Sequence, residues 1–117
     1  MLVPAPNLKV YIAIGKTDMR KAINGLSILV ESHMELDPLS GNIFVFSNKR
    51  RNMIKLLYWD HNGFCLWQKR LEKHRFIWPK SGQEVMEVDQ RQLMWLLEGL
   101  DVDNLQGHGR LSYKSVI

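Results

Sequence analysis

The sequence predicts an α+β fold, in which an antiparallel β-sheet with a meander or hairpin core carries two amphipathic helices on one face. Strand-like segments follow one another from residue 43 to residue 71 and are separated only by short polar turns. Two further segments, 18–34 and 90–100, carry apolar residues at helical spacing. Consecutive strands joined by tight turns pair antiparallel, and the helices then cover a face of the sheet.

The N-terminal segment predicts a strand followed by a helix. Residues 9–14 alternate in the manner of a strand, with Val10, Ile12 and Ile14 on one side, and Gly15 ends the pattern. We expect Thr17 or Asp18 to cap the helix, because a short oxygen-bearing side chain accepts a hydrogen bond from a free amide of the first turn. The apolar stripe expected on this helix consists of Met19, Ala22, Ile23, Leu26, Leu29, Val30 and Met34.

The centre of the chain predicts three consecutive strands. Residues 43–46 are all apolar, which indicates a strand buried on both faces. Residues 54–59 and 64–71 are rich in aromatic and branched side chains. The pair Asn62-Gly63 between them is typical of a hairpin turn, since both residues tolerate a positive φ.

A short strand over residues 85–88 and a second helix complete the predicted domain, which covers residues 1–100. Asp89 is the expected cap of this helix, with Gln92 in the capping-box position three residues later. Residues 101–117 lack a clear periodicity and are predicted to be a flexible C-terminal tail. The buried face of the second helix is expected to be formed by Leu93, Leu96, Leu97 and Leu100.

The charges are distributed unevenly along the chain. The 117 residues include 16 Lys and Arg against 12 Asp and Glu, which gives a formal net charge of +4. Nine basic residues and two acidic ones fall between Lys49 and Lys80, whereas acidic residues dominate between Glu84 and Asp103. A basic centre favours a polyanionic partner.

The basic residues form two clusters that the predicted topology brings together. In an antiparallel meander, the turn after residue 48 and the segment after residue 68 emerge at the same edge of the sheet. Such an edge suits contacts to DNA phosphates. The two clusters together contain seven cations, which are Lys49, Arg50, Arg51, Lys69, Arg70, Lys73 and Arg75. If each of them neutralises one phosphate, log affinity falls with log salt at a slope of roughly −6. The residues predicted to contact DNA are Lys49, Arg50, Arg51, Lys55, Lys69, Arg70, Lys73 and Arg75, together with Arg20 and Lys21.

Composition alone leaves open whether the basic cluster binds a nucleic acid or an acidic protein surface. The aromatic residues interleaved with it are expected to pack in the core, because large apolar side chains on strands usually face inward. Stacking on exposed bases is their alternative role. These aromatic residues are Tyr58, Trp59, Trp67, Phe76 and Trp78.

The residues offer little support for an enzyme. Cys65 is the only cysteine, so neither an intramolecular disulfide nor a cysteine-built zinc site can form. The four histidines are far apart in sequence, and no glycine-rich phosphate loop is present. Asp60 and Glu72 suggest a restriction-type nuclease pair, but the lysine that this motif needs two residues after the acid is replaced by His74. We therefore expect a protein that is not an enzyme and that uses no metal or cofactor.

The N-terminus lacks the basic start and long apolar run of a secretory signal. No apolar stretch reaches the roughly 18 residues that a transmembrane helix needs. The expected location is the cytoplasm, with no membrane partner.

The sequence resembles one known family over residues 17–100. It is similar to TnpB, the Orf2-like accessory proteins of bacterial insertion sequences of family sixty-six. Ala22 and Ser47 depart from residues common in that family. The similar segments are Thr17-Asp18-Met19-Arg20-Lys21, Asp37-Pro38, Ser40-Gly41, Phe44-Val45-Phe46, Asn48-Lys49-Arg50-Arg51, Lys55, Tyr58-Trp59-Asp60, Gly63-Phe64, Leu66-Trp67, Lys69-Arg70-Leu71-Glu72, Phe76, Trp78-Pro79 and Leu96-Leu97-Glu98-Gly99-Leu100.

The resemblance implies an accessory protein encoded beside a separate DDE transposase, to which the strand-transfer carboxylates belong. Two hypotheses follow. In the first, the chain is a non-enzymatic factor that binds DNA, such as the element ends, through the seven clustered cations. In the second, it is an interaction module that docks the transposase or a sister accessory protein without touching DNA, through the acidic helix at 93–103, the tail and apolar residues of the hairpin.

Overall fold

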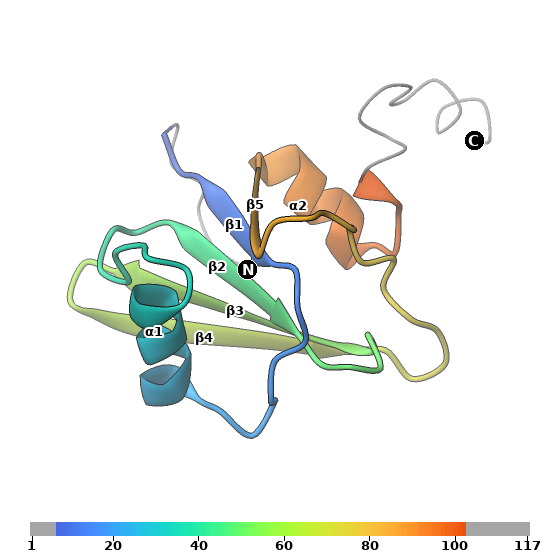
Figure 1. Cartoon of the computed structure of the whole chain (residues 1–117), viewed down its shortest axis with the longest axis horizontal. Helices are drawn as coiled ribbons and strands as arrows, with labels where there is room; N and C mark the ends of the chain where they lie inside the picture. The colour runs from blue at the N-terminus through green and yellow to red at the C-terminus, as the bar shows by residue number, and fades with distance from the viewer. Residues whose placement is uncertain (1–6, 103–117) are drawn as a thin grey trace.

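This computed structural model describes residues 7–102, which contain five strands and two helices joined by loops (Figure 1). Each predicted strand and helix is present, although the first helix is shorter than predicted at both ends. In chain order the elements are β1 (Val10–Ala13), α1 (Ile23–Ser32), β2 (Ile43–Ser47), β3 (Met53–Asp60), β4 (Gly63–Arg70), β5 (Val85–Val88) and α2 (Gln90–Leu97).

The strands form one mixed sheet in the order β4-β3-β2-β1-β5. Strands β1 and β2 are parallel, with Val10 opposite Ile43, whereas the other three pairings are antiparallel. The α+β class is confirmed, but the prediction of a purely antiparallel sheet is wrong at this one pairing. A helix joins β1 to β2 and returns the chain to the end from which it started, so the second strand runs parallel to the first.

The two helices cover opposite faces of the sheet, and the prediction that both lie on one face is wrong. Strand β2 shows the division, because Ile43 and Val45 pack in the cluster that contains Leu93 of α2. Phe44 of the same strand packs with Leu26 of α1. Every residue of β2 is buried, so each face of this central strand needs its own cover.

The β3–β4 hairpin is confirmed, with a register that runs from Met53 opposite Arg70 to Asp60 opposite Gly63. The turn differs in detail from the prediction. Gly63 is already paired in β4, and His61 carries the positive φ of 58°. The amide of Asn62 donates to the carbonyl of Asp60 across this residue, so the chain reverses at His61.

Helix α1 begins later than predicted, at Ile23, and neither Thr17 nor Asp18 caps it. Ala22 occupies the N-cap position without a side-chain hydrogen bond. The Asp18 carboxylate instead accepts from the backbone amide of Arg20, 2.9 Å away, and closes a separate turn. The amide of Thr17 donates to the carbonyl of Ser47 and so extends the contact between the β1 and β2 ends.

Helix α2 begins as predicted. The Asp89 carboxylate accepts from the Gln92 amide at 2.7 Å, and the Gln92 side chain accepts from the Asp89 amide, which completes the capping box. Val102 is fully buried in the core that α2 covers. The rest of the predicted tail, residues 103–117, lies outside the described residues. No helix within residues 7–102 has the length and apolar character to cross a bilayer.

Candidate nucleic-acid interface

Two loops that are far apart in sequence lie side by side at one end of the sheet. The first is the turn 48–52 between β2 and β3, and the second is the segment 71–79 that follows β4 (Figure 1). The amide of Leu71 donates to the carbonyl of Asn52 at 2.8 Å, and the amide of Phe76 donates to the carbonyl of Arg51 at 2.7 Å. These backbone bonds fix the loops against each other.

A polar cleft of about 190 Å³ opens between the two loops. Arg50 lines it from the first loop, and Lys73, His74 and Arg75 line it from the second. All four residues are exposed. The structure therefore brings the two predicted clusters together. We use the name basic edge for the exposed cations at this end of the molecule, which are Lys16, Lys49, Arg50, Arg70, Lys73 and Arg75.

Arg70 shares this edge with a carboxylate. Its Nε lies 3.3 Å from Oε2 of Glu72. The side chains are 60% and 74% exposed, so water screens the pair and leaves the guanidinium reachable from solvent.

Arg51, also predicted to contact DNA, turns inward. Its Nη2 donates to the carbonyl of Ile14 at 3.0 Å, and its guanidinium carbon lies 5.0 Å from the centroid of the Trp78 ring. Its Nη1 is buried without a hydrogen-bond partner among the described residues. Burial lowers the pKa of this guanidinium from its ordinary value. These contacts give Arg51 a structural role in joining the first loop to the end of β1.

Lys55 and Lys69 also direct their ammonium groups at backbone carbonyls. Lys55 is only 7% exposed, and its Nζ donates to the carbonyls of Met19 and Lys21 at 2.8 and 2.9 Å. Lys69 donates to the carbonyl of Leu97 at 2.8 Å, where the C-terminus of α2 favours a positive charge. Both lysines therefore join segments of the fold to the sheet.

Arg20 and Lys21 lie on the loop that Lys55 holds, and both are exposed. Arg20 pairs with Asp18 through an Nη2–Oδ2 contact of 2.7 Å. This hydrogen bond is the main reason why the pKa of Asp18 falls to about 2. The two cations do not line the cleft of the basic edge.

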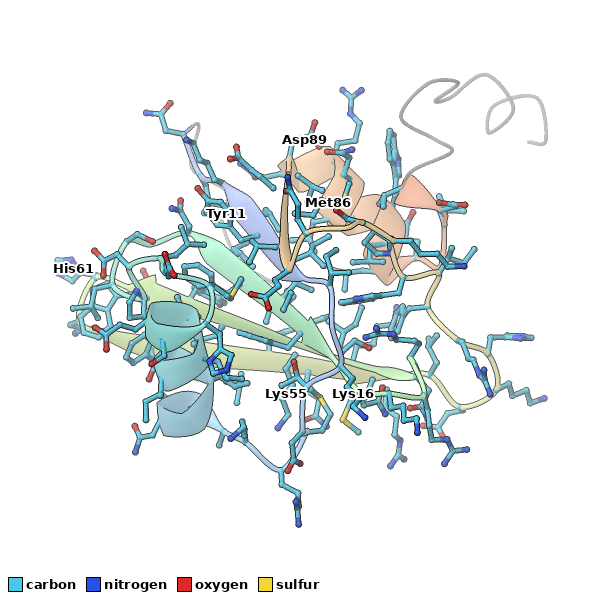
Figure 2. All side chains as sticks on the ribbon, viewed as in Figure 1. Tyr11, Lys16, Lys55, His61, Met86 and Asp89 are labelled. Carbon is cyan, nitrogen blue, oxygen red and sulfur yellow. The ribbon has the colours of Figure 1, made fainter. Side chains whose placement is uncertain are left out.

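Lys16 is an exposed cation of the basic edge that the sequence analysis did not identify. It follows the end of β1, next to Thr17, whose amide bonds to the last residue of β2. Figure 2 shows Lys16 at this end of the sheet and His61 at the opposite end. Only the parallel pairing of β1 with β2 puts Lys16 beside the first loop. A sequence prediction that recognised the β1–α1–β2 crossover would have found it.

Asp60 and Glu72, the predicted alternative nuclease pair, lie at opposite ends of the hairpin. Asp60 is paired with Gly63 beside the turn, whereas Glu72 follows Arg70 at the far end, where Arg70 pairs with Met53. With about 3.3 Å per residue along a strand, the two ends are about 23 Å apart. These two carboxylates cannot bind one metal ion. Within the described part of the chain, no group of three His, Cys, Asp or Glu side chains is arranged to hold one.

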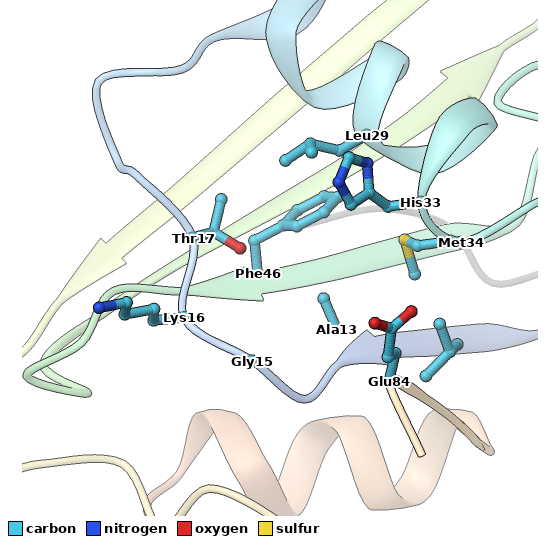
Figure 3. A pocket seen from close by; sticks show the side chains of 10 residues that line it. Ala13, Gly15, Lys16, Thr17, Leu29, His33, Met34, Phe46 and Glu84 are labelled. Carbon is cyan, nitrogen blue, oxygen red and sulfur yellow. The ribbon is translucent and has the colours of Figure 1, made fainter.

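A second hollow, of about 220 Å³, lies on the face of the sheet that carries α1. The C-terminal end of α1 and the end of β1 form its walls (Figure 3). Apolar side chains line most of it, with polar groups around them. The residues labelled in Figure 3 are Ala13, Gly15, Lys16, Thr17, Leu29, His33, Met34, Phe46 and Glu84.

Comparison with known proteins identifies the class. The family model described as "IS66 Orf2 like protein" matches residues 8–107. Two proteins of Sinorhizobium fredii (strain NBRC 101917 / NGR234) are similar over 101 residues. "Uncharacterized protein y4hO" is 39% identical, covering 86% of this chain and 88% of its own length, and "Uncharacterized protein y4jC" is 36% identical, covering 86% of each. No solved structure matches the chain.

These matches define an accessory protein associated with bacterial insertion sequences. The chain belongs to the IS66 Orf2-like family, and the resemblance inferred from the sequence is confirmed.

Proposed function

We propose that this chain is a non-enzymatic accessory factor of insertion-sequence transposition, which binds duplex DNA through the basic edge. It would hold DNA, such as the element ends, for a separate DDE transposase of the same element. The observation that carries this proposal is the cleft in which Arg50 lies opposite Lys73 and Arg75. These cations come from loops joined by backbone hydrogen bonds, so binding would not have to order them first.

The chemistry of these side chains fits a phosphate backbone. Arginine guanidinium groups bind phosphate oxygens in a bidentate manner, and a lysine adds a compact positive charge. The six cations of the basic edge lie in loops or, for Arg70, at the last residue of β4, whereas the acidic residues of 84–101 lie in β5 or in the segments that flank β5 and α2. Charges of one sign gathered at an edge steer a polyanion toward it.

A salt titration tests this proposal. Fluorescence anisotropy with a duplex from the element end, and with a scrambled duplex, should show binding that weakens steeply with salt. If six cations each neutralise one phosphate, the slope of log affinity against log salt is roughly −5. The slope is smaller than the sequence alone predicts because Arg51 and Lys69 bind backbone carbonyls, whereas Lys16 adds one exposed cation. No binding at low salt would refute the proposal.

A matched substitution locates the interface. The double variant Arg50→Ala/Lys73→Ala should reduce the magnitude of the salt slope by about 2, roughly one unit for each lost phosphate contact. Arg91→Ala removes an exposed arginine on α2, away from the basic edge, and should leave the slope unchanged. Equal losses in both variants would contradict a localised interface.

The hollow of Figure 3 supports a second candidate function, docking of the transposase or of a sister accessory protein. Its apolar floor and its volume of about 220 Å³ suit a single aliphatic or aromatic side chain from a partner. The apolar stripe of α2 is a poorer surface for docking, because Leu93, Leu96 and Leu97 are buried against the sheet. Co-purification with the transposase without DNA, and its loss in Ala13→Trp, would favour docking.

A further inference from the structure

An isoleucine lies exposed among the cations of the second loop. Along residues 75–78 the exposure alternates, with Arg75 and Ile77 outside and Phe76 and Trp78 inside. Ile77 is 45% exposed, whereas Phe76 and Trp78 are 3% and 8% exposed. In an extended chain, alternate residues point to the same side, so Ile77 shares the solvent side with Arg75.

The residues on either side of Ile77 are both held in place by hydrogen bonds. The amide of Phe76 donates to the carbonyl of Arg51 at 2.7 Å. On the other side, the indole nitrogen of Trp78 donates to the carbonyl of Ile14 at 3.0 Å, and the Trp78 ring lies beneath the Arg51 guanidinium. Ile77 is therefore held outward by two buried aromatic neighbours. An apolar side chain presented in this way can enter a ligand without a large loss of conformational entropy.

From this arrangement we infer that Ile77 is an apolar wedge, which inserts between base pairs of the bound duplex and bends it. The inference rests on the proposed function, since the cations of the basic edge must first hold the DNA. Proteins that bend DNA through its minor groove combine cations on the phosphates with an exposed Ile, Leu, Met, Phe or Pro that partly unstacks one base step. Arg75 beside Ile77 and Lys80 three residues later supply the cations.

Ring closure of a short DNA fragment tests the inference. A linear duplex of about 100 base pairs is shorter than the persistence length of about 150 base pairs, so ligase closes it rarely unless a protein bends it. Wild-type protein should raise the yield of circles several-fold at saturating concentration. Ile77→Ala should abolish most of this increase while binding the same fragment within about threefold of the wild-type affinity, because phosphate contacts supply most of the affinity. Ile77→Leu retains a branched apolar side chain and should therefore preserve the increase in circle yield.

Ile28→Ala is the matched control, because Ile28 is also an exposed isoleucine, at 59%, but lies on α1. Ile28→Ala should raise the yield of circles as much as the wild type does. Binding of each protein is measured on the same fragment by gel shift. The wedge inference would be overturned if the wild type bound the fragment without raising the yield of circles, or if Ile77→Ala raised that yield equally. Either result would leave the proposed function intact. No binding by the wild type would overturn both.

Discussion

The guanidinium carbon of Arg51 lies 5.0 Å from the centroid of the Trp78 ring, and Nη2 of the same arginine donates to the carbonyl of Ile14. This contact joins the first basic loop, the second basic loop and the end of β1. Arg51, which the sequence predicts to contact DNA, therefore stabilises the loops that carry the exposed cations.

Replacing Arg51 should destabilise the fold, by an amount that depends on the replacement. Arg51→Ala should lower the free energy of unfolding by about 2–3 kcal/mol, because it removes a charged hydrogen bond and the contact with the Trp78 ring. Arg51→Gly should cost about 1 kcal/mol less, since the φ of 58° strains any residue with a Cβ. Urea unfolding measures both. A glycine variant less stable than the alanine variant would contradict the conformation at this position.

Lys55→Met should lower the free energy of unfolding by about 2–3 kcal/mol, because two charge-assisted hydrogen bonds to the loop before α1 are lost. The salt slope of DNA binding should not change in the folded variant. Lys49→Met is the control with the opposite pattern. It should alter stability by no more than about 0.5 kcal/mol but reduce the slope by about 1, since Lys49 is exposed on the turn.

The pair of Asp18 and Arg20 predicts a pH dependence at acid pH. The hydrogen bond from the Arg20 side chain lowers the pKa of Asp18 from 3.8 to about 2. Because the pKa of Asp18 is lower in the folded state, the contribution of the pair to the free energy of unfolding is present above about pH 4. It is lost as the pH falls through about 2. NMR titration of the Asp18 carboxyl carbon measures this pKa directly. Arg20→Gln should raise this pKa toward its ordinary value, while the hydrogen bond from the backbone amide of residue 20 remains. An unchanged value would show that the pair does not form in solution.

The double variant Asp60→Asn/Glu72→Gln should support transposition as well as the wild type, since about 23 Å of strand separates the two carboxylates. A transposition assay in cells carrying the rest of the element provides the measurement. Glu72→Gln alone should, if anything, strengthen DNA binding, because it removes a negative charge 3.3 Å from Arg70. Loss of transposition in the double variant, with DNA binding intact, would restore the nuclease hypothesis.

Local pattern was enough to predict much of this protein. The apolar run at 43–46, the hairpin of β3 and β4 and the capping box of Asp89 and Gln92 depend on neighbouring residues, and the structure has each of them. The family also follows from the sequence, because its combined motifs extend over most of the chain. The antiparallel meander was sufficient to predict that the two basic loops meet at one edge.

Tertiary structure alone decided what each cation does. In the sequence, Arg51, Lys55 and Lys69 cannot be distinguished from the basic residues around them. In the structure, the ammonium or guanidinium group of each donates to a backbone carbonyl of a segment at least 28 residues away in sequence. The parallel pairing of β1 with β2, and the burial of both faces of the sheet under different helices, likewise depend on how the α1 crossover returns the chain. These pairings and contacts depend on residues that are distant in sequence, so neither the type of a residue nor its sequence neighbours predict them.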